Sequence, residues 1–367
     1  MRGEPDQARL GGVLTTALEV VTAPLDQGRR VALRWLLATP VLGRLVRDRD
    51  RRVGLHAFVG VGAALTLTAL WPAALFVVGP LLLGVAHVVG DLRYLVLRRS
   101  VSSSVVVLGA VFAAGLFAAR VTDMLMPGAG LTAAQELRAI ELWAGASVVA
   151  AVLSQHGQRA RGLIAGGLVL GLGAAAQARP DLAQMAFAHL HNVIGIALWL
   201  WLFRRRVAPV VPALALLVAG LVLVGSGVTL GQAESRGALT FGGQHLSSVA
   251  EWVAPGLPAR WMLGALMTYI LLQAVHYSVW IAWVPQEDTR AEGTMSFRMS
   301  ARSLRDDLRW LTVPVVLVAV AVPLIALRHG AVLTRDGYLS LASFHGYLEV
   351  AMAAYFFVAP AALERSR

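Results

Sequence analysis

The sequence predicts an all-α protein: a polytopic membrane bundle of about ten transmembrane helices with both termini in the cytoplasm. Three observations predict this fold class. Of the 367 residues, 57% are hydrophobic and only 14% are charged. Apolar runs of about 17 to 25 residues, each long enough to cross the hydrocarbon layer as a helix, recur along almost the whole chain. Arginines gather at the ends of these runs, where membrane topology would place them.

Residues 1–52 come first and predict a basic, amphipathic segment at the membrane interface. The stretch is apolar on one face and arginine-rich on the other, a pattern typical of helices that lie in the headgroup layer. Pro24 and Pro40 are expected to divide it into separate helices, because proline removes a backbone donor. We expect no cleaved signal peptide, since the stretch lacks a compact apolar core with a small-residue cleavage site.

Residues 53–367 are expected to form a single transmembrane domain. Its spans are apolar runs that alternate with short polar or basic connections. The longest expected outer loop follows the seventh span. In chain order the expected spans cover residues 53–72, 73–97, 101–119, 131–154, 162–178, 182–203, 209–230, 261–284, 311–327 and 338–359.

The arginine clusters predict the orientation of the bundle. Each cluster precedes the first span, follows an even-numbered span or ends the chain, so all of them fall on one side of the membrane. The positive-inside rule makes that side the cytoplasm, and we expect an integral protein of the bacterial inner membrane. The clusters contain Arg47, Arg49, Arg51, Arg52, Arg98, Arg99, Arg159, Arg161, Arg204, Arg205, Arg206, Arg290, Arg298, Arg302, Arg305, Arg309, Arg365 and Arg367.

Net charge and cysteine content exclude several classes of function for this protein. The formal charge of +11 is explained by the arginines at the span ends, so membrane lipids rather than nucleic acid are the expected acidic partners. The chain has no cysteine, which excludes disulfides, thiolate zinc sites, iron–sulfur clusters and cysteine nucleophiles. Protein partners are not predicted by the sequence.

Five of the nine histidines fall inside the expected spans. All five lie on even-numbered helices, which run from the outer to the inner side. At 1.5 Å per residue, His87 lies roughly 16 Å before Arg98, and His276 and His191 lie at a similar depth. His345 lies a little closer to the outer face, which brings Glu349 near mid-depth. Ionisable groups are rare inside membranes unless they meet partners within the bundle. The five are His87, His189, His191, His276 and His345.

Carboxylates share helix faces with two of these histidines. His87 and Asp91 are four residues apart, as are His345 and Glu349, so each pair lies on one face of its helix. Gln273 and His276 share a face in the same way at a spacing of three.

His189 and His191 point about 200° apart on an ideal helix, so both cannot face one centre unless the helix is distorted. We favour His189 as the inward side chain, because it shares its face with Asn192.

Ligand-type groups from four helices at one depth predict a shared divalent metal. Neutral imidazoles and carboxylates both ligate such ions, whose charge offsets the buried carboxylates. A mixed nitrogen and oxygen set suits iron, zinc or manganese and disfavours copper(I). Open positions in such a set are typical of oxygen-activating iron, the expected cofactor. The candidate ligands are His87, Asp91, His189, His191, His276, His345 and Glu349.

The decapeptide "AHVVGDLRYL", residues 86–95, resembles the histidine-plus-aspartate helix of the Brp/Blh-type membrane carotenoid dioxygenases. That resemblance implies one iron held through histidines, with His87 among its ligands. It covers only this decapeptide and the histidine-rich character of the bundle. The later paired-histidine helix of the family is missing, and His345 with Glu349 has no counterpart in it.

The function that these patterns favour is an iron-dependent, oxygenase-like oxidoreductase acting on a lipid-soluble substrate. Three alternatives use the same residues: a haem-binding electron carrier, a proton-coupled transporter with a histidine and carboxylate relay, and a metal-stabilised scaffold. A purely structural reading is also open, in which Arg93 holds His87 and Asp91 as a helix–helix contact. The substrate, the metal, the nuclearity and the oligomeric state are not predicted.

Overall fold

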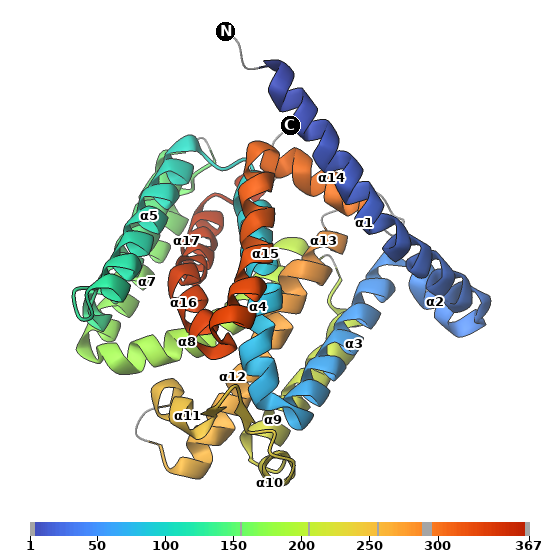
Figure 1. The fold of residues 1–367 in the computed structure, drawn as a ribbon. Helices are drawn as coiled ribbons and strands as arrows, with labels where there is room; N and C mark the ends of the chain where they lie inside the picture. Colours follow the sequence, from blue (N-terminus) through green and yellow to red (C-terminus); the bar gives the residue numbers. More distant parts are fainter. Residues whose placement is uncertain (1–3, 155, 205, 255–256, 288–295, 364–367) are drawn as a thin grey trace.

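The computed structural model describes residues 4–154, 156–204, 206–254, 257–287 and 296–363, and these residues are nearly all helical (Figure 1). Four of the arginines counted above, Arg205, Arg290, Arg365 and Arg367, lie outside the described residues. The α-helices are α1 Glu4–Ala38, α2 Pro40–Arg47, α3 Arg49–Leu70, α4 Pro72–Asp91, α5 Ser103–Leu125, α6 Ala133–Leu153, α7 Arg159–Ala178, α8 Pro180–Leu198, α9 Val211–Gly225, α10 Leu230–Ser235, α11 Ser247–Val253, α12 Ala259–Ser278, α13 Val284–Glu287, α14 Phe297–Leu308, α15 Thr312–His329, α16 Ala331–Ala342 and α17 Phe344–Val358.

Shorter elements complete the chain. Three π-helical turns are η1 Leu92–Leu97, η2 Trp199–Phe203 and η4 Val279–Trp283, and three 3-10 turns are η3 Ala208–Val210, η5 Arg309–Leu311 and η6 Pro360–Leu363. Two strands, β1 Thr240–Phe241 and β2 Gln244–His245, form an antiparallel hairpin.

Nine helical segments of the described chain are long and apolar enough to cross a membrane. The expected span 131–154 corresponds to α6, which is not among the nine and which carries Glu136, Arg138 and Glu141. The nine are Arg49–Leu70, Pro72–Leu97, Ser103–Leu125, Arg159–Ala178, Pro180–Phe203, Ala208–Gly225, Trp261–Glu287, Phe297–His329 and Ala331–Val358. Their length and composition are those of a helical membrane bundle.

The long connection between α9 and α12 contains a small hairpin that the sequence analysis did not predict. Thr240 pairs with His245 and Phe241 with Gln244 across a two-residue turn. Gly242 and Gly243 both have positive φ, 59° and 80°, which this kind of tight hairpin turn requires. The Gly-Gly pair was therefore a usable sequence signal for the hairpin. In Figure 1 this connection lies at the end of the bundle opposite α14.

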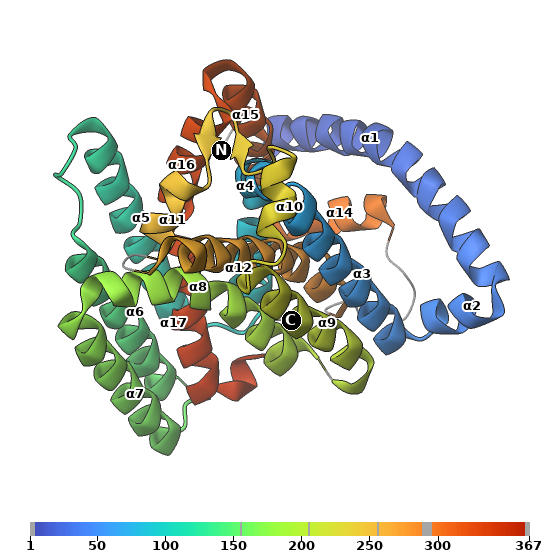
Figure 2. The same ribbon diagram turned by 90° about the horizontal axis from the view of Figure 1, so that it is seen from below.

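The N-terminal segment forms an arm along one edge of the bundle, and its boundaries differ from those expected. Figure 2 shows α1 as a continuous curved helix that passes through Pro24 without a break. The expected break at Pro24 is wrong, because a single proline can bend a long helix instead of ending it. The break before Pro40 is present, and Pro40 begins α2. The first span begins at Arg49 rather than at residue 53.

The arm is fastened to α14 by a carboxylate. The Asp26 side chain of α1 accepts hydrogen bonds from the backbone amides of Phe297, at 2.7 Å, and Arg298, at 3.1 Å. These amides belong to the first turn of α14 and have no partner within that helix. Ser296 is the N-cap residue of α14, and Asp26, which is only 5% exposed, adds capping hydrogen bonds from a distant part of the chain.

Replacing Asp26 with alanine is expected to weaken the docking of α14 by about 1 kcal/mol, the usual effect of losing an N-cap. Hydrogen–deuterium exchange at the first turn of α14 should become faster. Asp306→Ala is the control, because Asp306 lies exposed on α14 and pairs with its neighbour Arg305. Unchanged protection in the Asp26 variant would contradict the cap.

The same contact is expected to depend on pH. Burial would raise the pKa of the Asp26 carboxyl, but hydrogen bonds from the Arg298 and Phe297 amides outweigh burial and lower it. The stabilisation is therefore fully present above the unfolded pKa of about 4 and is lost as the pH falls through the lower folded-state pKa. Exchange at the start of α14, corrected for its intrinsic pH dependence, should rise only below about pH 4.

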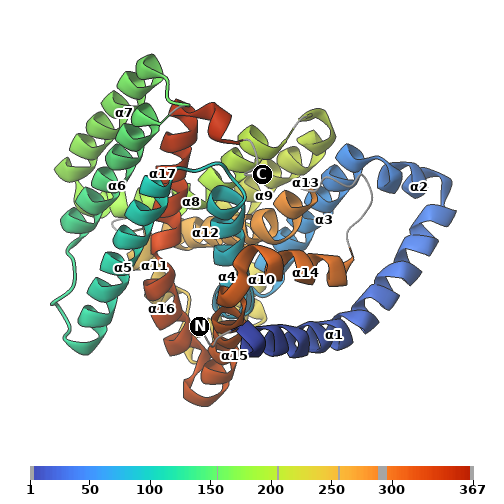
Figure 3. The same cartoon turned by 90° about the horizontal axis from the view of Figure 1, so that it is seen from above.

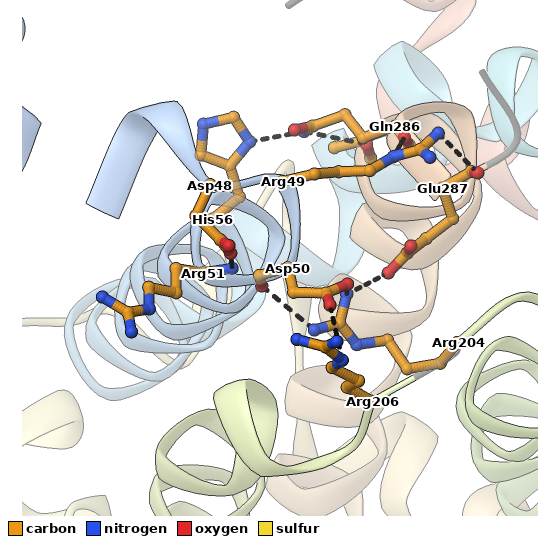
Figure 4. A network of polar contacts seen from close by, with 10 residues as sticks. Asp48, Arg49, Asp50, Arg51, His56, Arg204, Arg206, Gln286 and Glu287 are labelled. Atoms are coloured by element: carbon orange, nitrogen blue, oxygen red, sulfur yellow. Dashed lines mark hydrogen bonds and ion pairs between the residues drawn. The ribbon is translucent and has the colours of Figure 1, made fainter. Parts of the chain in front are cut away.

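Polar contacts tie the ends of three spans together at one end of the bundle (Figure 4). The fully buried Arg204 side chain, after η2, contacts Glu287 at the end of α13 and lies 3.5 Å from Asp50 at the start of α3. Arg49 donates to the carbonyl of Gln286 at 3.1 Å and to that of Glu287 at 2.9 Å. Two spans thus end where a third begins, as the arginine pattern predicts.

The centre of the bundle is built by α4, α8, α12 and α17. Figure 3 shows these helices between the arm of α1 and α2 on one side and α5, α6 and α7 on the other. α12 contacts α4 and α8, and α17 contacts the same two helices. Three of the four, α4, α8 and α12, run directly into the π-helical turns η1, η2 and η4. Such turns rotate the helix face by one residue and are frequent at functional sites.

Candidate metal centre

Three central helices bring four ligand-type side chains together. α4 supplies His87 and Asp91, α12 supplies His276, and α17 supplies His345. One nitrogen or oxygen from each of the four lies within 4.8 Å of the corresponding atom of every other. All four side chains are buried. This arrangement of atoms could hold one metal ion, and we call these four residues the His/Asp cluster.

The spacing of two imidazoles fits joint coordination. The Nε2 atoms of His87 and His345 face each other at 3.1 Å. Two nitrogens bound at about 2.1 Å to one metal and at right angles to each other would be about 3.0 Å apart. The ring centroids of the same pair are 4.7 Å apart with the planes at 85°, so the rings meet edge to face rather than stacked.

The second nitrogen of His345 is held by the backbone. Its Nδ1 lies 2.5 Å from the carbonyl oxygen of Ala342, which can only accept, so Nδ1 carries the proton. The lone pair of a neutral ring is then on Nε2, the atom that faces His87. Metal-bound histidines commonly donate their other ring N–H to a carbonyl in this way, which fixes the tautomer and the ring orientation.

Several buried polar atoms of the site have no hydrogen-bond partner among the described residues. Both carboxylate oxygens of Asp91 and Oε2 of Glu349 belong to this set. Buried polar atoms are nearly always paired, so a cluster of unpaired ones indicates a shared partner. A positive ion among these atoms would satisfy several of them at once.

Arg93 does not neutralise Asp91. The Arg93 guanidinium instead contacts Asp307 and donates to Ser303 at 2.7 Å, which ties η1 to α14. The structural reading in which Arg93 holds His87 and Asp91 together is therefore wrong. Asp91 is left buried, 0% exposed, and the described residues give its carboxylate no cationic partner.

His191, rather than His189, approaches the cluster, so the preference for His189 as the inward side chain is wrong. The ring of His191 lies 5.1 Å from that of His276 and 5.4 Å from that of His345, centroid to centroid. His189 instead places Nε2 3.2 Å from the carbonyl oxygen of Val253. Because α11 covers that face of α8, His189 finds its partner outside the cluster.

The close approach of α8 explains which face turns inward. A Cβ atom added to Gly195 would lie 2.5 Å from Nδ1 of His276 and 3.1 Å from Nε1 of Trp280. Gly195 is one turn beyond His191, so both lie on the face that meets α12. A glycine four residues after a histidine was the sequence signal for His191, and the pairing of His189 with Asn192 gave no information on this contact.

Glu349 lies beside the cluster rather than among its four members. Its Oε1 accepts a hydrogen bond from Trp280 Nε1 at 2.8 Å and lies 3.7 Å from Nε2 of His276. Its Oε2 is buried without a partner among the described residues. The π-helical turn η4 carries Trp280, so this turn orients the second carboxylate of the site.

Aromatic rings cover two further sides of the site. The ring of Tyr277 lies 4.4 Å from that of His87, and the ring of Phe187 lies 6.1 Å from that of His191. Tyr338, which the sequence analysis did not single out, places its hydroxyl against Gly84 of α4, 2.6 Å from a Cβ built there. The rings of Tyr277 and Phe187 thus add apolar surface beside the cluster, and Tyr338 adds a buried hydroxyl.

Replacing Gly195 with alanine is expected to disturb the cluster, because the added methyl must displace the His276 ring. We expect metal affinity to fall by 10- to 100-fold, as for other changes that reorient a ligand, and overpacking to cost about 1–3 kcal/mol. Gly167→Ala on α7 is the control, since a Cβ there meets nothing within 4 Å. Equal metal content in the two variants would contradict the contact.

Comparisons of the chain with models of protein families, with curated proteins and with solved structures find no match.

Proposed function

We propose that the protein is an integral membrane metalloenzyme whose His/Asp cluster holds one divalent metal. The observation that carries the proposal is the convergence of His87, Asp91, His276 and His345, from three helices, on one buried point. Iron is the proposed metal, because imidazole with carboxylate and without thiolate is typical of non-haem iron. His191 and Glu349 lie next to the cluster and could complete or tune the coordination.

The proposed reaction class is oxidation of a lipid-soluble substrate. A bound iron with an open position supplies oxygen-activating chemistry. The chain supplies the rest: His345 is oriented by Ala342, Trp280 holds Glu349, and Tyr277 and Phe187 give the surroundings an apolar character. A site inside a membrane bundle is reached most directly by substrates that dissolve in the bilayer.

The proposed topology has ten crossings with both termini in the cytoplasm of a bacterial cell. In this proposal α6 crosses the membrane in addition to the nine apolar segments, as the fourth crossing in chain order, and its Glu136 is neutralised by contact with Arg120 of α5. The polar contacts of Arg49, Arg204 and Glu287 support a common cytoplasmic end for α3, α8 and α13. Residues 1–52 are proposed to lie on the inner leaflet.

Haem is a weaker candidate for the same cluster. Two axial histidines of one haem iron would have their coordinating nitrogens about 4 Å apart, on opposite faces of a porphyrin. His87 and His345 approach to 3.1 Å, and the ring of His276 lies 5.4 Å from that of His87. A porphyrin between these rings would overlap them. The geometry therefore favours a bare metal ion.

Elemental analysis with an optical spectrum tests the proposal. Protein purified in mild detergent should contain about one iron per chain and show no Soret band. The His87→Ala, His276→Ala double variant should lose the metal while keeping its helix content and elution volume. If elemental analysis finds about one zinc or manganese per chain instead, the metal site is supported and the assignment of iron is contradicted. An equal metal content in the double variant would contradict the proposal.

A further inference from the structure

A cavity outside the His/Asp cluster lies between α6, α7 and α8. Its volume is about 460 Å³, within the range of small-molecule sites, and its walls are almost entirely apolar. Figures 2 and 3 show α6 and α7 on the edge of the bundle away from α1, and the central helix α8 packs against both. We call this space the α6–α8 cavity.

Small residues create the cavity. Ala144 of α6, Gly173 and Ala176 of α7, and Ala183 and Ala186 of α8 all line it. The space is open on one side, because Leu172, Leu182 and Leu190 of its lining are exposed. On α8 the lining residues run from Leu182 to Leu190, which is about 12 Å along the helix axis.

One end of the cavity carries a cation. Arg179, in the turn between α7 and α8, lines the cavity and is exposed, and its guanidinium has no hydrogen bond or ion pair with the described residues. The carboxylate of Glu141 also lines the cavity, but it already pairs with Arg138 at 2.6 Å. The unpaired charge at this end is therefore positive, and it fits an anionic head group.

The cavity approaches the proposed metal centre through one aromatic ring. Phe187 lines the cavity. The same ring lies 6.1 Å from the ring of His191, with the planes at 25°. His191 in turn contacts His276 and His345. A hydrocarbon chain in the cavity would therefore be separated from the histidines by the side chain of Phe187 alone.

We propose that the α6–α8 cavity binds a single-chain anionic amphiphile, with its hydrocarbon chain between the three helices and its head group on Arg179. The end of the chain reaches Phe187. The assignment of this molecule as the substrate rests on the proposed function. The binding of the amphiphile is independent of the proposed function, because every residue that forms the cavity lies outside the His/Asp cluster.

Photolabelling tests the site. The probe is a long-chain fatty acid with a diazirine in its chain, added to the protein in phosphatidylcholine nanodiscs. We expect labelled peptides from α6, α7 and α8. Ala176→Trp, which fills the cavity, should reduce this labelling by about tenfold or more. Ala174→Trp is the matched control, because Ala174 lies exposed on the same helix and does not line the cavity.

Arg179→Gln tests the head-group contact. It should weaken labelling by the fatty acid about 2- to 5-fold, the range for an exposed ion pair, and leave labelling by the matching diazirine alcohol unchanged. Ala186→Phe provides a second filling variant in case Ala176→Trp does not fold. Metal content, measured on every variant, should equal that of the wild type.

The outcomes separate the two proposals. Labelling that is unaffected by either filling variant would overturn the cavity assignment even if metal is bound. A diazirine phosphatidylcholine serves as a competing probe. If it labels the cavity as strongly as the fatty acid does, and the fatty acid does not displace it, the cavity assignment is overturned as well, because the occupant is then a bilayer lipid. Cavity labelling as expected in a wild type without metal would support the binding site and contradict the proposed function.

Discussion

Replacing Asp91 with asparagine is expected to change stability in opposite directions with and without metal. In the metal-free protein the Asp91 carboxylate is buried, and neither oxygen has a hydrogen-bond partner among the described residues. The isolated Asp91 carboxyl costs several kcal/mol at neutral pH, either as the desolvation of its charge or as the uptake of a proton on folding, and a neutral amide costs about 1–3 kcal/mol. The metal-free variant should therefore be more stable than the metal-free wild type by about 1–3 kcal/mol.

With metal present the order should reverse. The carboxylate offsets the charge of the ion, whereas an amide does so only weakly, so the variant should bind metal at least about 100-fold less tightly. Metal that binds only the folded state stabilises it in proportion to its affinity. Thermal unfolding with and without a chelator measures both effects.

Asp307→Asn is the control for Asp91→Asn. Asp307 is also a partly buried carboxylate, but Arg93 and Arg98 neutralise it. Its replacement should lower stability equally with and without metal. If Asp91→Asn also lowered the stability of the metal-free protein, Asp91 would have another partner, and the metal interpretation would be contradicted.

A graded series of histidine variants is the second prediction with a large effect. His276→Ala should lower metal affinity by more than about 100-fold, because it removes a ligand. His191→Ala should lower it by 10- to 100-fold, the range for residues that contact a ligand from outside. His189→Ala should leave it unchanged, since His189 bonds to the carbonyl of Val253. Metal titration of the purified variants gives the three affinities.

His189→Ala is a matched control for His191→Ala, because His189 lies two residues from His191 on the same helix. If truncating any histidine in the membrane lowered metal affinity non-specifically, His189→Ala and His191→Ala would lower it equally. Equal loss of metal in His189→Ala and His276→Ala would contradict the geometry of the cluster. No loss in His276→Ala would contradict the cluster itself.

The helices were largely predictable, because apolar runs of membrane length have few alternatives. The expected span 73–97 matches α4 with η1, Pro72–Leu97, within one residue. Features that depend on contacts between segments were not predictable. α1 continues through Pro24, and no local pattern marks the π-helical turns after α4, α8 and α12.

The site was predictable where two ligand-type residues share one helix face. The spacing of His87 with Asp91 and of His345 with Glu349 reflects real shared faces, and all four side chains are buried at the centre. The choice between His189 and His191 depended on which face of α8 meets α12. That contact is decided by Gly195, whose missing side chain admits His276. Spacing along one helix contains no information about its neighbour.

X-ray absorption at the edge of the bound metal tests the central claim most directly, because it reports the ligands themselves. The proposal predicts about three imidazole nitrogens and at least one oxygen at roughly 2.0–2.2 Å, with the outer-shell scattering of histidine rings. In His276→Ala the imidazole scattering should fall by about one ring or the metal should be absent. A first shell without imidazole, or with a porphyrin, would contradict the account.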